Sequence, residues 1–223
     1  MTRLLTAVAL CGLITGNLFA ASVKGKVAFL TRRGQRPILE ETLISLEPMG
    51  TAPRTAPASF AMTTRGKAFL PHVLVVPVGS TVSFPNEDPI SHNLFSLTPG
   101  NTFDLGLYRK GTAAKTHKFD APGTVNVYCN IHPNMSAVVQ VVNTPYFGFA
   151  DNQGNFSVDA PAGRYRLVAW NEQGGMSTSN VEVKADGSVA GATQLTIDSR
   201  DIRLGQHTNK EGKAYPKNTS RDY

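Results

Sequence analysis

The sequence predicts an all-β protein built from two β-sandwiches, and three observations support this. After an apolar opening segment, the 223-residue chain consists of short runs in which apolar and polar residues alternate, without a helical repeat. These runs are rich in β-branched residues and are separated by Gly and Pro, as in strands joined by tight turns. With 41% hydrophobic and 17% charged residues, the chain is able to bury one sizeable core or two small ones.

Residues 1–21 have the pattern of a secretory signal peptide. Arg3 precedes a long uncharged run that ends in small residues at 20–22. Leu18 or Phe19 falls where cleavage prefers a small residue, so an uncleaved membrane anchor stays open as the alternative. Because no later stretch is apolar enough to cross a membrane, we expect a periplasmic or secreted mature chain without a membrane span.

The four blocks that follow define the expected strands. Residues 22–50 hold the alternating runs "VKGKVAFL" and "ETLISLEP", which we interpret as the opening strands of a flanking sandwich. Residues 51–66 are rich in Pro, Ala and Thr and are interpreted as a linker or loop. Residues 67–143 supply a second sandwich through "HVLVVPVG", "STVSFPN", "THKFDAPG", "TVNVYCN" and "SAVVQVVN". Residues 144–200 complete the flanking sandwich, with turns at "DNQGN" and "APAG".

The chain ends in a basic segment, residues 201–223. The formal charge of +6 becomes +5 (6 − 1) without Arg3, and much of this excess lies near the end of the chain. Since the segment has few apolar residues and no periodicity, we expect a mobile tail suited to an acidic partner or anionic surface. We do not expect nucleic acid as a partner of an exported chain.

Signal cleavage leaves a single cysteine. Cys11 lies within the signal, so the mature chain keeps only Cys129 and closes no internal disulfide. The ordinary role of one cysteine is burial as a small hydrophobe. The neighbours of Cys129 decide whether that interpretation holds.

The stretch "VYCNIHPNM" contains three side chains that transition metals prefer: Cys129, His132 and Met135. A fourth, His92, lies upstream in "FPNEDPISHNLFS". Two His, one Cys thiolate and a weakly bound Met form the ligand set of blue-copper electron transfer, so these residues are the candidate ligands of one type 1 copper ion. Zinc is the alternative metal, although a thioether is a poor zinc ligand. Met135 by itself also fits core packing.

The predicted loop favours a rigid site. A strand ending at Cys129 would turn through "NIHPNM" into the next strand, so that three ligands lie on one tight loop. Pro133 fixes its own φ and restricts His132, which stiffens the loop. We expect His92 to arrive from a neighbouring hairpin, and Asn93 to hydrogen-bond between the two loops and orient the ligands.

These motifs resemble a known family. "CNIHPNM" resembles the ligand loop Cys-x-x-His-Pro-x-Met of the amicyanin and plastocyanin cupredoxins, and "VGSTVSFPNEDPISHN" is similar to the segment that carries their first histidine. The resemblance covers about residues 67–143. It implies a cupredoxin Greek-key β-sandwich whose copper is bound by the four candidate ligands. It also implies a role in electron passage for Tyr128, whose position has that role in plastocyanins.

The flanking blocks resemble a second family. "VKGKVAFL" and "GNFSVDAPAGRYRLVAWN" are similar to parts of a transthyretin-like, carboxypeptidase-regulatory-like β domain. Exported proteins known as methylamine utilization proteins are similar in the order of these parts. The resemblance implies a cupredoxin inserted into, or packed on, a small β-sandwich. Members often carry His after the Trp, whereas Asn171 follows Trp170 here, so no role is carried over to that position.

From these features we expect a one-electron carrier and not an enzyme. Electrons would pass through the edge of His132, framed by Pro89, Ile90, Pro133 and Asn134, to a cytochrome or periplasmic dehydrogenase that docks transiently. We expect the chain to be a monomer. It has neither a paired His-x-His motif nor a Gly-x-Ser-x-Gly elbow.

Two other functions stay open. One is a copper-binding or copper-delivery protein in which the flanking sandwich docks a partner. The other makes that sandwich a carbohydrate or peptide binder with the metal unit appended. The remaining histidines, His72, His117 and His207, are interpreted as surface or strand residues and not as ligands.

Overall fold

The computed structural model describes residues 20–51, 53, 55–202 and 207–215. Nearly all of the predicted signal peptide lies outside these residues. The part that is described consists of strands and one short 3-10 helix, η1 (Leu39–Glu41), which confirms the predicted all-β class. Within it, no helix has the length and apolar character needed to span a membrane.

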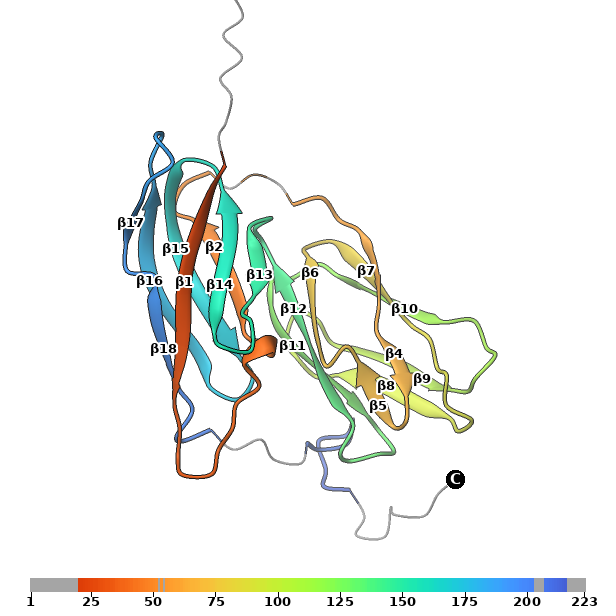
Figure 1. Ribbon diagram of the computed structural model, residues 1–223. Helices are drawn as coiled ribbons and strands as arrows, with labels where there is room; N and C mark the ends of the chain where they lie inside the picture. The colour runs from red at the N-terminus through yellow and green to blue at the C-terminus, as the bar shows by residue number, and fades with distance from the viewer. Residues whose placement is uncertain (1–19, 52, 54, 203–206, 216–223) are drawn as a thin grey trace, which may run out of the picture.

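The flanking sandwich is formed by segments from both ends of the chain (Figure 1). One sheet has the order β13-β2-β15-β16-β17, with bounds Phe147–Phe149, Leu43–Pro48, Gly163–Asn171, Gly175–Val183 and Val189–Gly191. The other has the order β14-β1-β18, with bounds Asn155–Ala160, Ala21–Leu30 and Gln194–Asp198. Their inward side chains, among them Val27, Leu46 and Leu167, share one core.

The metal-site sandwich is formed by the middle of the chain. Its larger sheet has the order β6-β12-β11-β8-β9, with bounds Val73–Pro77, Ser136–Val142, Gly123–Cys129, His92–Ser96 and Phe103–Tyr108. The facing sheet has the order β10-β7-β3, with bounds Lys115–Phe119, Ser80–Phe84 and Ser59–Ala61. A two-stranded pair, β4 (Thr63–Arg65) and β5 (Ala68–Leu70), completes it. Phe84, Phe119 and Val139 belong to the second core.

Strand alternation decides where Cys129 points. Along β11, Val125, Val127 and Cys129 are buried, and the residues between them are partly exposed. Since successive side chains in a strand point to opposite faces, Cys129 enters the core and Tyr128 faces away from it.

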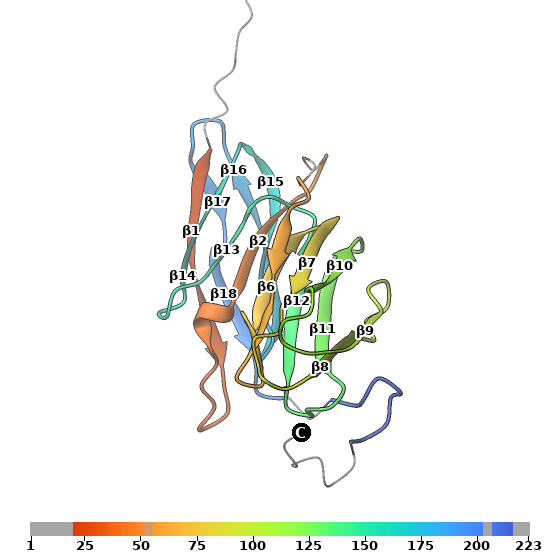
Figure 2. The same cartoon turned by 90° about the vertical axis from the view of Figure 1, so that its right-hand side faces the viewer.

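The two sandwiches lie side by side and share a small apolar contact (Figures 1 and 2). Leu43 of one sandwich packs with Val75 and Val142 of the other, and Trp170 covers this cluster. Beside it, the imidazole Nε2 of His72 lies 2.5 Å from the carboxylate Oε2 of Glu172. This ion pair and the apolar cluster join the two halves of the molecule.

The predicted linker over residues 51–66 is wrong in its second part. β3 runs parallel to β7, and β4 pairs antiparallel with β5. The reason is an alternation within "FAMTT": Met62 and Thr64 are fully buried, whereas Ala61 is exposed and Thr63 is partly exposed. The Pro, Ala and Thr composition concealed this period of two, which is the signal of a half-buried strand.

Candidate metal centre

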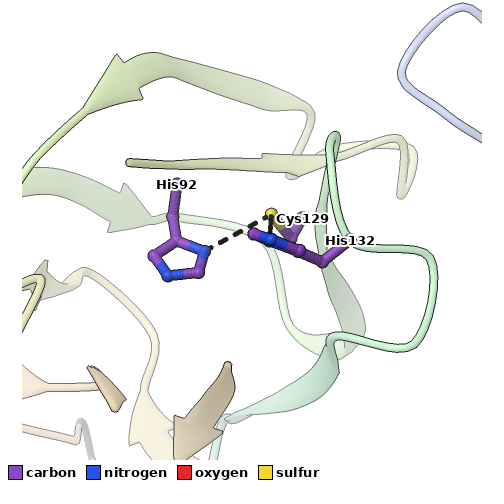
Figure 3. A group of neighbouring side chains, drawn as sticks. All are labelled: His92, Cys129 and His132. Carbon is purple, nitrogen blue, oxygen red and sulfur yellow. Dashed lines mark hydrogen bonds between the residues drawn. The ribbon is translucent and has the colours of Figure 1, made fainter. Parts of the chain in front are cut away.

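Three of the four predicted ligands come together in the structure. Cys129 Sγ lies 3.8 Å from His92 Nδ1 and 3.5 Å from His132 Nδ1 (Figure 3). All three ligand atoms lie within 4.8 Å of one another. His92 and Cys129 are fully buried, and His132 is partly exposed.

These separations fit a bound transition metal. Imidazole nitrogen binds such an ion at ~2.0–2.1 Å and thiolate sulfur at ~2.3 Å, taking zinc as the reference. With tetrahedral to trigonal angles, the nitrogen and sulfur atoms are then about 3.5–3.8 Å apart. The Cys129 to histidine distances match that range. The thiol and both imidazoles therefore suit a soft or borderline ion such as copper.

Backbone hydrogen bonds hold the ligand loop closed between β11 and β12. The Cys129 N–H donates to the Met135 carbonyl at 3.1 Å, and the Met135 N–H donates to the His132 carbonyl at 3.0 Å. Pro133 lies within this turn, as expected from the sequence. Met135 is 2% exposed and belongs to the core of the metal-site sandwich. Its role as an axial ligand stays a prediction.

A carboxylate that the sequence reasoning missed orients His92. The Nε2 of His92 lies 2.9 Å from Asp88 Oδ2. Asp88 also accepts hydrogen bonds from the backbone N–H groups of Gly66 (2.5 Å) and Lys67 (2.9 Å). Although burial acts to raise it, these hydrogen bonds and that of His92 hold the pKa of Asp88 below its usual value.

An ionised carboxylate only accepts hydrogen bonds, so Nε2 of His92 carries the proton and Nδ1 has a free lone pair facing Cys129. This is the arrangement of a carboxylate–histidine–metal group. Burial lowers the pKa of His92, although Asp88 acts in the opposite direction, and a neutral imidazole is the form that binds metal. The sequence signal was the acidic residue four positions before His92 in "NEDPISH".

The environment of the Cys129 sulfur combines burial with backbone donors. Burial raises the pKa of the Cys129 thiol, and the N–H groups of Asn93, Ile131 and His132 act to lower it. Without a cation the thiol form is therefore favoured. A metal ion supplies the positive charge that would stabilise the thiolate.

Asn93 links the two ligand-bearing segments, but not as the sequence reasoning expected. Its backbone carbonyl accepts the N–H of Asn130 at 3.2 Å, beside Cys129. Its side-chain Nδ2 instead donates to Asp104 Oδ1 at 2.6 Å, away from the ligand loop. The connection between the loops is thus made by the backbone.

Tyr128 lies on the outer face of β11, at a cleft between the sandwiches that Trp170 and His207 also line. Its ring stacks on His207, with centroids 4.1 Å apart and planes at 15°. His207 belongs to the predicted mobile tail, of which residues 207–215 have defined contacts in the structure. Residues 203–206 and 216–223 lie outside the described part.

The other histidines have structural contacts. His117 stacks on Phe103 with centroids 4.2 Å apart, and His72 pairs with Glu172. Among the described residues, neither joins the cluster around Cys129. Asn171 is buried and donates through Nδ2 to the Ile38 carbonyl and to Thr42 Oγ1, which gives it a structural role in the flanking sandwich.

No family model matches this chain, and no curated protein matches it. Among solved structures it is similar to a purple cupredoxin from Nitrosopumilus maritimus, at 26% identity and TM-score 0.33, covering 37% of this chain and 98% of that one. An oxidised amicyanin variant matches at 20% identity and TM-score 0.35, covering 44% and 99%. A pseudoazurin matches at 20% identity and TM-score 0.31, covering 40% and 76%. At these TM-scores the function is inferred from the side chains alone.

Proposed function

We propose that this protein is an exported type 1 copper protein that carries single electrons between redox partners. The observation that supports it best is the buried Cys129 thiol with two imidazole Nδ1 atoms at 3.5 and 3.8 Å. Copper bound by this set would alternate between Cu(I) and Cu(II), which moves one electron without transforming a substrate.

The residues around the ligands favour a site that changes little between oxidation states. Asp88 fixes the ring of His92, and two backbone hydrogen bonds close the loop from Cys129 to Met135. Ligands already held in place need little rearrangement when the charge on the metal changes. Small rearrangement favours rapid electron transfer.

His132 offers the route to a partner. It is the partly exposed ligand. Pro133 and the exposed Asn134 follow it in the sequence, and the exposed Pro89 and the partly exposed Ile90 precede the other histidine, His92. An uncharged patch of this kind suits brief docking of a cytochrome or periplasmic dehydrogenase. We propose that the chain acts there as a monomer.

The burial of the ligands favours electron transfer over copper delivery. A delivery protein must pass its ion to a partner, which requires ligands that the partner can reach. His92 and Cys129 are fully buried, and this favours a resident ion.

The test is a visible and electron-spin-resonance spectrum of residues 22–223 after one equivalent of Cu(II), then ascorbate. We expect an intense blue band with narrow hyperfine splitting that reductant bleaches and oxidant restores. Cys129→Ser should abolish the band. His117→Gln, a histidine in the same sandwich outside the cluster, should retain it. A pale spectrum with wide splitting in the unaltered protein would refute the proposal.

A further inference from the structure

Residues 207–215 lie against the metal-site sandwich, beside the turn that joins β11 and β12 (Figure 2). The segment has its own local structure. Asn209 Oδ1 accepts the N–H groups of Glu211 and Lys213, and the Asn209 N–H donates to the Lys213 carbonyl at 2.8 Å. This compact turn gives the side chains of His207, Lys210 and Tyr215 defined positions.

The first contact reaches a ligand residue directly. The hydroxyl of Tyr215 donates to the Cys129 carbonyl at 2.7 Å. The same hydroxyl lies 3.2 Å from Nδ1 of His207, whose ring stacks on Tyr128. Two aromatic side chains of the segment therefore hold the end of β11, where Cys129 begins the ligand loop.

The second contact reaches the residues that follow two ligands. The N–H of Lys210 donates to Asn130 Oδ1 at 2.9 Å, next to Cys129. The Lys210 ammonium lies 2.8 Å from Asp104 Oδ2. The other oxygen of Asp104 accepts from Asn93, next to His92, at 2.6 Å. Lys210 therefore connects the Cys129 loop with the strand that carries His92.

We propose that residues 207–215 are a positioning strap that fixes the Cys129 loop relative to His92. Tyr215 and Lys210 are its positioning residues, and they act through the Cys129 carbonyl, Asn130 and the Asp104–Asn93 pair. The strap also covers Tyr128, on which the His207 ring stacks. The proposal rests on the proposed function for the identity of the ion, but the positioning itself is a property of the chain without metal.

The test uses three variants of the full chain. Tyr215→Phe removes one hydroxyl and keeps the ring. Lys210→Ala removes the ion pair with Asp104. Lys213→Ala is the matched control, because it removes the same charge from the same turn and its side chain has no partner among the described residues.

For the loaded protein the measurements are Cu(I) affinity by competition with a chromophoric chelator, the reduction potential and the spin-resonance spectrum. We expect roughly tenfold weaker binding in Tyr215→Phe and in Lys210→Ala, with a shifted potential and spectrum, since loss of an outer partner costs about 10- to 100-fold in metal affinity. Lys213→Ala should match the unaltered protein. If both test variants match Lys213→Ala, the strap has no positioning role. If only one of the two test variants changed the affinity, potential and spectrum, the segment would not act as a single strap.

Amide hydrogen exchange of the metal-free protein tests the same idea without copper. We expect faster exchange over residues 129–135 in Tyr215→Phe and Lys210→Ala than in Lys213→Ala. Absence of a blue band from the unaltered protein refutes the proposed function but leaves this readout valid. Equal exchange in all three variants refutes the strap whatever metal the site binds.

Discussion

Asp88 and His92 form a buried pair in which the carboxylate Oδ2 lies 2.9 Å from the imidazole Nε2. Because Asp88 holds the proton on that nitrogen, the other nitrogen of His92 is directed at Cys129 with its lone pair free. The pair decides the tautomer and the ring orientation before any metal binds.

Removing the charge of Asp88 should weaken metal binding. We expect Asp88→Asn to lower Cu(I) affinity by about 10- to 100-fold, because the outer partner that orients His92 is lost. Competition with a chromophoric chelator measures this. Asp120→Asn, which alters a surface carboxylate of the same sandwich paired with Lys118, is the control and should leave affinity unchanged. Equal affinity in the two variants would contradict the role assigned to Asp88.

Met135→Leu separates a ligand from a core residue. The exchange nearly conserves volume, so the free energy of unfolding without metal should change by less than about 1.5 kcal/mol. If the thioether binds copper, its loss removes a donor that Cu(II) needs more than Cu(I) does, and the reduction potential should rise. Protein-film voltammetry measures this shift. An unchanged potential would mean that Met135 only fills the core.

The His72–Glu172 pair predicts a pH-dependent contact between the sandwiches. The hydrogen bond that His72 donates to the Glu172 carboxylate raises the pKa of His72 above its usual value near 6.5, although burial acts against it. A pKa raised on folding gives stability that is fully present below about pH 6.5 and is lost as pH rises through the folded value. Thermal unfolding from pH 5 to 9 should show this loss in the unaltered protein, and His72→Gln should show a smaller one. If the thermal stability of the two proteins changed with pH in the same way, the His72–Glu172 pair would make no contribution.

Met62→Ala tests the strands found within the predicted linker. Met62 is fully buried, so its truncation should lower the free energy of unfolding by about 2–5 kcal/mol. Ser59→Ala, at an exposed position of β3, should change it by no more than about 0.5 kcal/mol. Urea unfolding of both variants gives the comparison. If Met62→Ala left the free energy of unfolding unchanged, the segment would not pack on the core as described.

The sequence by itself determined the all-β class and the residues that meet at the centre. Cys129 and His132 lie three positions apart on one turn, and the alternation of β11 directs Cys129 inward. Such local patterns can be predicted from the sequence, because strand periodicity and turn residues involve only a few neighbouring positions. His92, which lies 37 residues before Cys129, was predicted because blue copper needs a second histidine and "FPNEDPISHNLFS" supplies one in a loop.

Only the tertiary structure decided how those residues are held. The contact of Asp88 with His92 depends on the backbone of Gly66 and Lys67, and the contact of Tyr215 with Cys129 joins residues 86 positions apart. A polar basic segment gives no periodic signal, so residues 207–215 resembled a mobile tail until their partners were known. Hydrogen bonds and ring stacking between distant segments depend on positions that folding creates, and local sequence does not record them.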